Sequence, residues 1–533
     1  MIFMDLNNLV SKHFKDYNLI TPKNKNFGDI TVVIKTKDVK KLGDLKKDLE
    51  KYKEIEKVEQ KGLFLNIFYE PISRYYDSKK VKNNKKTVMI EYCQPNPNKE
   101  LHVGHLRNAV LGLALSNLIE RQNKVIRSTI YNDRGIHMCK SMVGYNHIKD
   151  KRDDSSFITE CYVKYSQLEK ENEKYTTEAQ ELLKKWEAKD KSVWELWQKI
   201  RDLALKSFNE IYKLFGVKFD FIFYESELYE KGKKYVLDLH KKGIVKKDDN
   251  GNYYFDLEKY KLPNKVVLRN DETAIYATTD VVLAKEKFEK YALDESIYVV
   301  SSDQELYFKQ LFAILDLLGF EGVKKCRHMS YGLVMLPSGK MSSRDGTVVS
   351  LKDFYDDIYA EAYKQTKEKR SDLAQKEIAA LAQKIALSGI KYYILKYDAK
   401  SSMIYDVKKS VSIEGESGPY LLYNYVRSKS IIEKSKIKPT KITEVYTEKE
   451  KEILRMLSEF NTKVDDCIKH LTTHFLAKYL YDLTSLLNAY YEETKIIDND
   501  FKKMKNRISL LSEATTTIKN GLELLSIDVV NEI

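Results

Sequence analysis

The chain has few of the residues and segments that mark secreted, metal-binding or membrane proteins. It contains only 5 cysteines in 533 residues, and none forms a CxxC pair. This argues against a disulfide framework and against a thiolate zinc site. No run approaches about 18 consecutive apolar residues, and the first residues lack the basic start and apolar core of a signal peptide. We therefore expect a protein of the reducing cytoplasm, without a membrane segment and without a tightly bound metal or organic cofactor.

Proline is also scarce. Its 8 copies leave the interval between Pro97 and Pro263 empty, which permits long helices there. The net charge of +13 suits a polyanionic partner such as RNA. Lysine far outnumbers arginine, however, so the excess charge can equally reflect a bias of the whole composition.

The pattern of apolar residues predicts three domains. Residues 1–80 form a small N-terminal α/β domain with strands at Ile30–Lys35 and Leu63–Tyr69 and a helix between them. Next, Thr87–Tyr92 reads as a strand, a helix begins near His102, and Val125–Ile130 reads as a second strand. Strand, loop, helix and strand are the opening of a parallel, doubly wound sheet. This Rossmann-type domain spans 81–405.

The remaining segments complete this division. A helical insertion at about 140–225 carries an apolar stripe that fits packing rather than cofactor binding. Strands are then expected at Lys265–Leu268, Ala274–Thr278 and Ser296–Val300. Residues 406–533 form an all-α bundle, because Leu476 and the leucines that follow it recur every three or four positions.

Two histidines three residues apart stand at the predicted start of the first Rossmann helix. In His102-Val103-Gly104-His105 the imidazoles share a helix face and can donate hydrogen bonds to phosphate oxygens. The helix start adds unpaired N–H groups, and Gly104 lets a nucleotide approach the backbone. Such a pair can also bind a metal ion or cap the helix.

A second motif lies more than 200 residues downstream, at Pro337–Thr347. This glycine-flanked loop carries Lys340, Ser342, Ser343 and Arg344. It suits a cationic clamp that closes on a triphosphate as pyrophosphate leaves. Alone it would be read as a solvated basic turn, but the histidine motif makes the clamp the better interpretation.

Together the motifs resemble the HIGH and KMSKS signatures of class I aminoacyl-tRNA synthetases. One lysine of the family pattern is replaced by Ser343, and Lys99, three residues before His102, is the candidate substitute. The resemblance implies that His102, His105, Lys340 and Lys99 are catalytic and that ATP enters with Mg²⁺. The implied ATP-binding residues are His102, Gly104, His105, Lys340, Met341, Ser342, Ser343 and Arg344.

Further segments resemble arginyl-tRNA synthetases in particular, from about residue 25 to the C-terminus. They are Phe27–Asp29, Glu91–Asn96, Asn132–Gly135, Ala274–Asp280, Gln304, Gly418–Tyr423 and Lys519–Leu525. One departure is Glu272, which stands where the family usually has glycine. The resemblance implies activation of L-arginine with ATP, in the presence of tRNA, and transfer to the terminal 2′-OH of tRNA(Arg).

The chemistry of arginine agrees with the residues in these segments. A guanidinium offers a planar fork of five donors, so its site needs acids. Glu91 and Asp280 are the candidates carried over by the motifs, with Tyr276 one helical turn before Asp280. Asn96 and Gln304 would hold the amino and carboxylate end of the amino acid. The alternatives are a structural salt bridge for Glu91 and a surface acid for Asp280.

The C-terminal bundle resembles the anticodon-binding domain of the same family. Tyr420, Tyr423 and Arg427 could stack on unpaired bases of tRNA, although the tyrosines could equally belong to the core. The N-terminal domain would contact the outer corner of the tRNA. The expected partners are tRNA(Arg), L-arginine and ATP, and a monomer is expected.

Three other functions share some of these features. Cysteinyl and other class I synthetases carry both motifs, but the zinc-binding cysteines of the cysteinyl enzyme are missing. A nucleotidylyltransferase also uses the HxGH motif, but it needs no long helical tail. A non-catalytic, RNA-binding relative would have no reason to keep both motifs and both acids.

Overall fold

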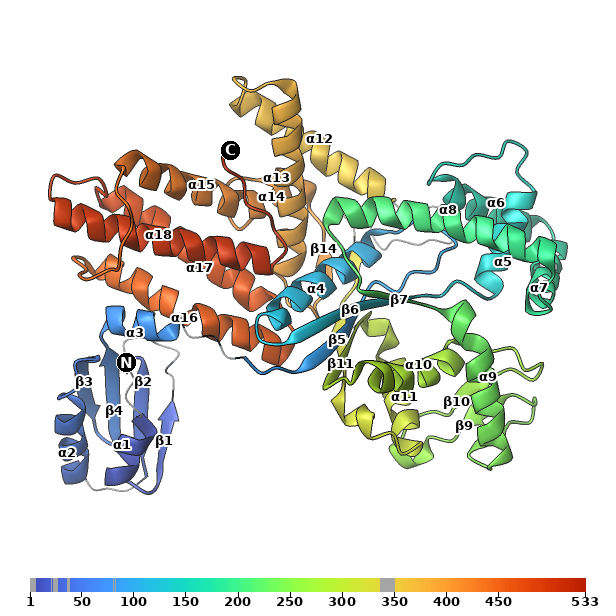
Figure 1. The fold of residues 1–533 in the computed structure, drawn as a ribbon, viewed down its shortest axis with the longest axis horizontal. Helices are drawn as coiled ribbons and strands as arrows, with labels where there is room; N and C mark the ends of the chain where they lie inside the picture. The colour runs from blue at the N-terminus through green and yellow to red at the C-terminus, as the bar shows by residue number, and fades with distance from the viewer. Residues whose placement is uncertain are drawn as a thin grey trace. The chain divides into compact units, whose positions relative to one another are not determined.

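The computed structural model describes residues 6–20, 22, 27–35, 39–79, 81, 83–335 and 350–533. The chain forms two compact units. Figure 1 shows its helices and strands, with colour running along the residue numbers. The first comprises residues 1–82, 424–465 and 478–521, and the second comprises residues 83–423, 466–477 and 522–533. Each unit is therefore assembled from segments that are far apart in the sequence.

The first unit contains the expected N-terminal α/β domain. Its antiparallel sheet has the strand order β1-β2-β4-β3. The strands are β1 (Tyr17–Ile20), β2 (Ile30–Ile34), β3 (Ile55–Lys61) and β4 (Phe64–Tyr69), and the helices are α1 (Leu6–His13), α2 (Val39–Leu49) and α3 (Pro71–Ser78). Alternating apolar residues of β2 and β4, such as Val32 and Ile67, are fully buried with Leu42 and Leu45 of α2.

The Phe27–Asp29 motif shapes this small domain. Gly28 has a left-handed backbone (φ 87°), and a Cβ there would lie only 2.7 Å from the carbonyl oxygen of Ile67. Asp29 is buried, accepts a hydrogen bond from the N–H of Tyr69 at 2.8 Å and pairs with Arg74. In the structure the motif therefore joins β2 to the end of β4 and the start of α3.

Helices follow one another through the C-terminal part of the chain. They are α15 (Gly418–Ser435), α16 (Glu448–His470), α17 (His474–Glu493) and α18 (Phe501–Leu524). The leucines spaced along α17 are fully buried, as the sequence pattern predicts. Within the first unit, Tyr75 of α3 donates to Glu513 of α18 at 2.6 Å, and Glu56 pairs with Lys451 and Arg455 of α16. The two ends of the chain thus share one packed unit.

The second unit is built on a parallel sheet with the strand order β12-β11-β5-β6-β7 (Figure 1). The strands are β5 (Thr87–Glu91), β6 (Lys124–Tyr131), β7 (Phe221–Tyr224), β11 (Glu295–Ser301) and β12 (Cys326–Tyr331). All neighbours pair in parallel. Helix α4 (Val103–Glu120) packs against β5, β6 and β11. The Rossmann-type fold expected from the sequence is confirmed.

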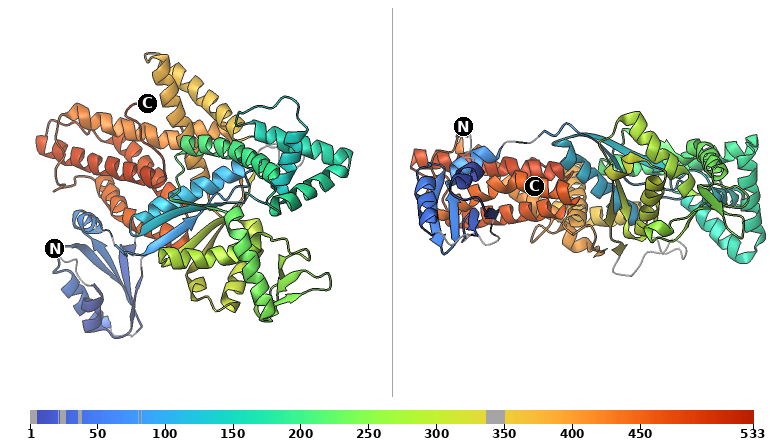
Figure 2. Two further views of the ribbon diagram at one scale, coloured as in Figure 1. Left: turned by 45° about the vertical axis from the view of Figure 1, so that its right-hand side comes forward. Right: turned by 90° about the horizontal axis from the view of Figure 1, so that it is seen from below.

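Insertions extend the sheet connections, as the two views in Figure 2 show. Helices α5 (Ile136–Asn146), α6 (Phe157–Glu171), α7 (Lys174–Glu187) and α8 (Lys191–Phe215) pack together between β6 and β7. The insertion before β11 holds α9 (Glu225–Lys241), β8 (Val245–Lys247), β9 (Tyr253–Phe255), η2 (Glu258–Tyr260), β10 (Lys265–Leu268) and α10 (Tyr276–Tyr291). Trp186 of α7 stacks on Trp194 of α8, and Trp197 contacts both rings. The residues of the apolar stripe, such as Trp197 and Ile200, are buried, which confirms a packing role.

The elements after β11 lead to the C-terminal helices. They are η3 (Ser302–Gln304), α11 (Glu305–Leu317), η4 (Glu321–Lys325), β13 (Val334–Met335), α12 (Leu351–Lys369), α13 (Gln375–Leu395), β14 (Met403–Ile404) and α14 (Val407–Val411). The short strands β13 and β14 pair in parallel with each other.

The strand predicted at Ala274–Thr278 is wrong. Only Ala274 makes a bridge, to Leu268, and helix α10 begins at Tyr276. The hydroxyl oxygen of Thr278 accepts a hydrogen bond from the N–H of Ile275 at 3.0 Å, which satisfies a donor at the helix start. Short apolar runs with threonine fit either structure, and here the cap favours the helix.

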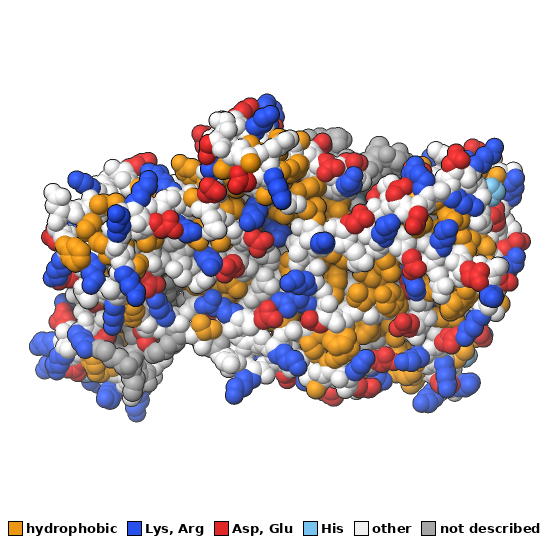
Figure 3. All heavy atoms as spheres, turned by 45° about the horizontal axis from the view of Figure 1, so that its top comes forward, with side chains coloured by type: hydrophobic (Ala, Val, Ile, Leu, Met, Phe, Trp, Pro, Cys, Tyr) orange, Lys and Arg blue, Asp and Glu red, His pale blue; other side chains and the backbone are white. Residues whose placement is uncertain are grey.

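On the face drawn in Figure 3, lysine and arginine are interspersed with acidic side chains, so charge alone does not mark one surface there. All five cysteines are free thiols. In the part of the chain that the structure describes, no helix has the length and apolar character needed to cross a membrane.

Candidate active site

The candidate site lies where the carboxyl ends of β5 and β11 approach the amino end of α4. The chain passes from β5 to β6 and β7 on one side of the sheet, then crosses to β11 and β12 on the other. Ligands of such sheets bind outside the carboxyl ends of the strands at this switch point. Glu91 ends β5 and Ser301 ends β11, so both the first acid of the site and Gln304 lie at this edge.

An unusual turn follows Glu91. Cys93 and Gln94 both have left-handed backbones, with φ of 79° and 37°. Asn108 of α4 holds the turn by accepting from the N–H of Cys93 at 2.8 Å, and Thr129 of β6 accepts from that of Gln94 at 3.2 Å. Positive φ is costly for residues other than glycine, so the surrounding helix and strand maintain this shape. Cys93 is buried and burial raises the pKa of its thiol to about 12, which supports packing rather than nucleophilic chemistry.

His102 and His105 cap α4 reciprocally. The Nδ1 atom of His102 accepts from the N–H of Gly104 at 3.1 Å, and that of His105 accepts from the N–H of His102 at 3.2 Å. The ring centroids are 3.9 Å apart. Because both Nδ1 atoms accept, a neutral ring carries its proton on Nε2. Capping the helix and presenting two Nε2–H donors are therefore compatible tasks.

The surroundings keep both rings neutral. Burial, with a contribution from Lys99, lowers the pKa of His102 to about 4. Burial also lowers the pKa of His105 well below its ordinary value, helped by His102 and Lys99. A neutral ring still carries its Nε2–H, so it can donate to a phosphate oxygen without first gaining a proton. At neutral pH, the positive charge at this corner comes from Lys99 and the helix start.

Gly104 and Lys99 complete this corner. A Cβ on Gly104 would lie 2.9 Å from Cε1 of His102, so any side chain would displace that ring. Lys99 is half-buried, burial lowers its pKa, and its Nζ lies 5.6 Å from the ring centroid of Tyr162. Its charge acts on both histidines, so the structure brings Lys99 to the site that the sequence assigned to it.

The second motif falls outside the described residues, including Lys340, Met341, Ser342, Ser343 and Arg344. Its flanking residues, however, lie at the site. Ser350 bridges to His102, and the N–H of Leu351 donates to the carbonyl of Leu101 at 3.3 Å. The described chain therefore resumes directly beside the first motif, although more than 200 residues separate the two motifs in the sequence.

Arg107 fixes the segment that leads into the second motif. This fully buried residue of α4 donates to the carbonyl oxygens of Gly332 (2.7 Å) and Leu333 (3.2 Å), just before β13. It also donates to Ala399 (3.1 Å) and Ser401 (2.8 Å), just before β14. Guanidinium donors in a fixed fork suit this four-carbonyl arrangement. No sequence motif singles out Arg107, because the residue is distinguished only by contacts between distant segments.

Glu91 is paired inside the protein. Its Oε2 forms an ion pair with Lys287 of α10, and both side chains are almost completely buried. Its Oε1 lies 3.5 Å from Nε2 of Gln94, at the limit of a hydrogen bond. The ion pair is the structural alternative that the sequence left open, and it does not occupy both carboxylate oxygens.

Asp280 stands on α10 and faces the same region. It is half-buried and accepts a hydrogen bond from the hydroxyl of Tyr307. Burial raises the pKa of Asp280 to about 6, opposed by the Tyr307 hydrogen bond and reinforced by the charge of Glu91. A carboxyl group near its titration point at neutral pH is typical of a functional site.

Three other residues are candidates for arginine binding. Tyr276 is 44% exposed, and its hydroxyl lies 3.5 Å from Nδ1 of His137. Asn96 is half-buried and Gln304 is exposed. No described residue hydrogen-bonds the side-chain amide of either, so these amides are available to a ligand.

Glu225 is a further acid at this edge that the sequence motifs do not single out. This residue begins α9 at the carboxyl end of β7 and is only 3% exposed. Burial raises its pKa to about 8, with Asp280 and Asp133 adding to the effect and Arg134, 4.0 Å away, opposing it. No hydrogen bond from the described residues reaches its Oε2. Its position after a strand-like run, like that of Glu91, was the available signal.

The Asn132–Gly135 motif connects the sheet to the helical insertion. Asp133 is buried and accepts from the N–H and hydroxyl of Ser226 at 2.9 and 2.8 Å. Arg134 is buried against Glu187 of α7 at 2.5 Å. These contacts hold the amino end of α9, and therefore Glu225, beside the sheet.

The residues proposed to contact unpaired bases lie on α15. Tyr423 is 41% exposed, Tyr420 is half-buried, and Arg427 is exposed with its guanidinium 5.2 Å from the ring centroid of Tyr491. Tyr425, in contrast, is buried. The spacing of Tyr420, Tyr423 and Arg427 places them on one side of the helix.

Two family models match consecutive parts of the chain. Residues 72–407 match the family of class I tRNA synthetases (R), catalytic domain. Residues 421–533 match the DALR anticodon binding domain. Together these matches cover both motifs, the acid-lined region and the C-terminal helices.

Curated relatives are similar over most of the chain. The arginine–tRNA ligase of Parabacteroides distasonis is 36% identical over 477 residues, which cover 83% of this chain and 80% of that protein. The arginine–tRNA ligase of Treponema denticola is 33% identical and covers 96% of this chain and 94% of its own length.

Solved structures share the fold at lower identity. The arginyl-tRNA synthetase of Thermus thermophilus has a TM-score of 0.85 at 22% identity, with 100% of both chains covered. That of Plasmodium falciparum has a TM-score of 0.81 at 22% identity and covers 99% of this chain and 97% of its own.

Proposed function

The chain belongs to the arginyl-tRNA synthetase family of class I, and we propose that the residues around the carboxyl ends of β5 and β11 carry out its ligation of arginine to tRNA. The observation that best supports these residues is their arrangement. Neutral Nε2–H donors of His102 and His105 lie beside Ser350, where the described chain resumes after the second motif. Family membership also removes a small nucleotidylyltransferase and a cysteinyl enzyme from consideration.

ATP binding is assigned to the first corner and the second motif. The Nε2–H groups of His102 and His105 donate to phosphate oxygens, and Gly104 leaves room for the nucleotide against the backbone. Lys99 supplies the cation that Ser343 cannot. Lys340 and Arg344, with Met341, Ser342 and Ser343 in the same loop, close on the triphosphate, and Mg²⁺ arrives with ATP as part of the substrate.

Arginine is assigned to the acid-lined region. The carboxylate of Asp280 takes one edge of the guanidinium, and Tyr276 borders it one helical turn away. Glu91 offers Oε1, while Lys287 holds Oε2. Asn96 and Gln304 have free amides to hold the α-amino and α-carboxylate groups. Lysine could not fill this arrangement, since an ammonium lacks the planar fork.

The reaction then proceeds by positioning and electrostatics. The arginine carboxylate attacks the α-phosphorus of ATP, the bond to the β-phosphate oxygen breaks, and pyrophosphate leaves with its electron pair. The histidine and lysine donors stabilise the charge on the transferring phosphate. In the second step the 2′-OH of the terminal adenosine attacks the carbonyl carbon of arginyl-adenylate, and AMP leaves.

The remaining assignments concern the domains and the setting. Residues 406–533 bind the anticodon region, with Tyr420, Tyr423 and Arg427 stacking on unpaired bases. Residues 1–80 contact the outer corner of tRNA(Arg), and residues 81–405, with the helical insertion at 140–225, catalyse both steps. The enzyme acts as a monomer in the cytoplasm, a setting in which its five free thiols are stable.

One assay tests this assignment. ATP–pyrophosphate exchange is measured with each amino acid, with and without an arginine-accepting tRNA. Exchange with arginine that depends on His105 and Asp280 is expected. Exchange with a different amino acid would overturn the arginine site, and tRNA binding without any exchange would identify a non-catalytic relative.

A further inference from the structure

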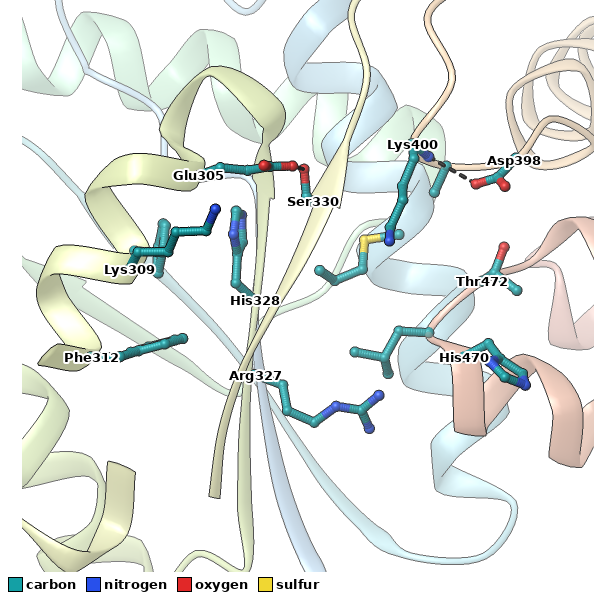
Figure 4. A pocket seen from close by; sticks show the side chains of 14 residues that line it. Glu305, Lys309, Phe312, Arg327, His328, Ser330, Asp398, Lys400, His470 and Thr472 are labelled. Carbon is teal, nitrogen blue, oxygen red and sulfur yellow. Dashed lines mark hydrogen bonds between the residues drawn. The ribbon is translucent and has the colours of Figure 1, made fainter. Parts of the chain in front are cut away.

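A cavity of about 410 Å³ opens in the second unit beside the outer strand β12. Three segments form it: β12 with helix α11, the residues just before β14, and the turn between α16 and α17 (Figure 4). Gln304, the residue before α11, ends the η3 turn that follows β11. The cavity is therefore next to the candidate active site along the chain but is not lined by its residues.

Cationic side chains surround this cavity. Figure 4 shows Lys309 of α11, Arg327 of β12 and Lys400, just before β14, around it. All three are exposed. No described residue forms an ion pair with Lys309 or Lys400, whereas Arg327 pairs with Glu295 at 3.0 Å and donates to the carbonyl of Lys469.

The two acids that line the cavity both accept hydrogen bonds from other lining residues. Glu305 accepts a hydrogen bond from the hydroxyl of Ser330 at 2.7 Å, and Asp398 accepts from the N–H of Lys400 at 3.0 Å. The Ser330 hydrogen bond lowers the pKa of Glu305, and the charges of Lys309, His328 and Lys400 lower it further. Both lysine ammonium groups therefore remain available to an anion.

The floor of the cavity is apolar. Met329 and Leu471 are buried, and Phe312 is half-buried beside them. His328 covers Phe308 in a stacked contact with ring centroids 4.5 Å apart. A cationic rim above an apolar floor matches one unit of a nucleic acid, with phosphate at the rim and sugar or base below.

One wall of the cavity is rigidly joined to the catalytic helix. Lys400 lies between Ala399 and Ser401, and Arg107 holds the carbonyl oxygens of both. Gly332 packs so closely that a Cβ there would lie 2.6 Å from the carbonyl carbon of Ser401. Since Arg107 follows His105 on α4, a group bound at Lys400 is held in a defined position relative to His105.

We propose that this cavity is a phosphate subsite that holds the sugar–phosphate backbone of the tRNA substrate. The proposal rests on the proposed function, because it takes tRNA as a substrate. Long, exposed side chains that only donate are typical of contacts that position a nucleic acid without reading its sequence. Through Arg107, the subsite aligns the bound tRNA with the catalytic corner.

The test removes both unpaired cations in a Lys309→Gln/Lys400→Gln variant. Affinity for an arginine-accepting tRNA transcript is measured by filter binding between about 50 and 200 mM KCl. Each lost phosphate contact reduces the slope of log affinity against log salt by about 0.7–0.9, so a decrease of about 1.4–1.8 is expected. The KM for tRNA should rise about tenfold while the KM values for ATP and arginine stay unchanged.

Lys290→Gln is the matched control, because Lys290 is an exposed lysine of α10 outside the cavity. Its salt slope should equal that of the wild type. An unchanged slope in the double variant would overturn the proposal. So would loss of inorganic phosphate binding by calorimetry with no change in tRNA binding, which would identify a small-anion site. The binding slope does not require catalysis, so an enzyme that binds tRNA without charging it would contradict only the proposed function.

Discussion

Lys287 of helix α10 and Glu91 at the end of strand β5 form an ion pair at the bottom of the candidate arginine site, with both side chains almost completely buried. The pair joins residues 196 positions apart. It fixes α10, and with it Asp280 and Tyr276, against the carboxyl end of the central strand.

This pair makes a prediction about stability. Lys287→Met should lower the free energy of unfolding by about 3–5 kcal/mol, because it leaves the carboxylate of Glu91 buried and unpaired. The Glu91→Gln/Lys287→Met double variant should recover most of that loss in a denaturant titration. If Glu91 also binds substrate, the KM for arginine in the double variant should remain above that of the wild type. Recovery of both the stability and the KM for arginine would assign Glu91 to structure alone.

The raised pKa of Asp280 predicts that arginine binding depends on pH. Its pKa of about 6 lies above the ordinary value, so the group is protonated just below pH 6 and ionised above it. Only the carboxylate pairs with guanidinium, so arginine affinity should rise with pH through about 6 and then level off. Calorimetric titration of arginine into the enzyme on both sides of pH 6 measures this.

Two variants check that assignment. Tyr307→Phe removes the hydrogen bond that lowers the pKa of Asp280, so the midpoint should move to higher pH. Asp280→Asn should weaken arginine binding at all pH values and leave ATP binding intact. It should also abolish the rise of arginine affinity near pH 6. Arginine affinity that is unchanged in Asp280→Asn would refute the role of this residue.

The position of Lys99 beside the two histidines predicts a role in adenylate formation. Lys99→Ala should lower the rate of adenylate formation by about 100-fold, the usual effect of losing one electrostatic donor to the transition state. It should also raise the pKa values of His102 and His105, because the charge of Lys99 lowers both. Single-turnover measurements give the rate, and Lys99→Arg serves as the charge-conserving control. A loss of less than twofold would mean that Ser343 needs no substitute.

The left-handed backbone of Glu272 leads to a prediction about stability. This residue stands where the family usually has glycine, and its backbone is left-handed with φ of 59°. Glu272→Gly should relieve a strain of about 1–2 kcal/mol, less the glycine entropy and the exposed pair with Lys233, for a net gain of about 0.5 kcal/mol. The melting temperature should rise slightly, and that of Glu272→Ala should not. A fall in the glycine variant would show that the Lys233 pair dominates.

Much of the fold could be predicted from the sequence because the signals are local. Strands β5, β6 and β11 are short apolar runs, and the leucines of α17 repeat at the helical period. The strand predicted at Ala274–Thr278 is wrong because its local signal is ambiguous. Its run of residues fits a strand or a helix start, and the hydrogen bond from Ile275 to Thr278 decides for the helix.

The candidate site was only partly predictable. The pair His102 and His105 is a local pattern, and its geometry follows from one helix turn. Glu225 carries a weak signal at the end of β7, and Lys287 and Tyr307 carry none, since each matters only through a partner far along the chain.

The sequence by itself determined the strand, loop, helix and strand that open the parallel sheet, the histidine pair at the start of α4 and the family to which the chain belongs. The tertiary structure alone decided which polar groups meet: Lys287 pairs with Glu91, Tyr307 donates to Asp280, and Arg107 donates to four carbonyl oxygens. The physical reason is that secondary structure depends on neighbours in sequence. The pKa of a carboxyl group and the availability of its oxygens depend instead on burial and on charges brought together by folding.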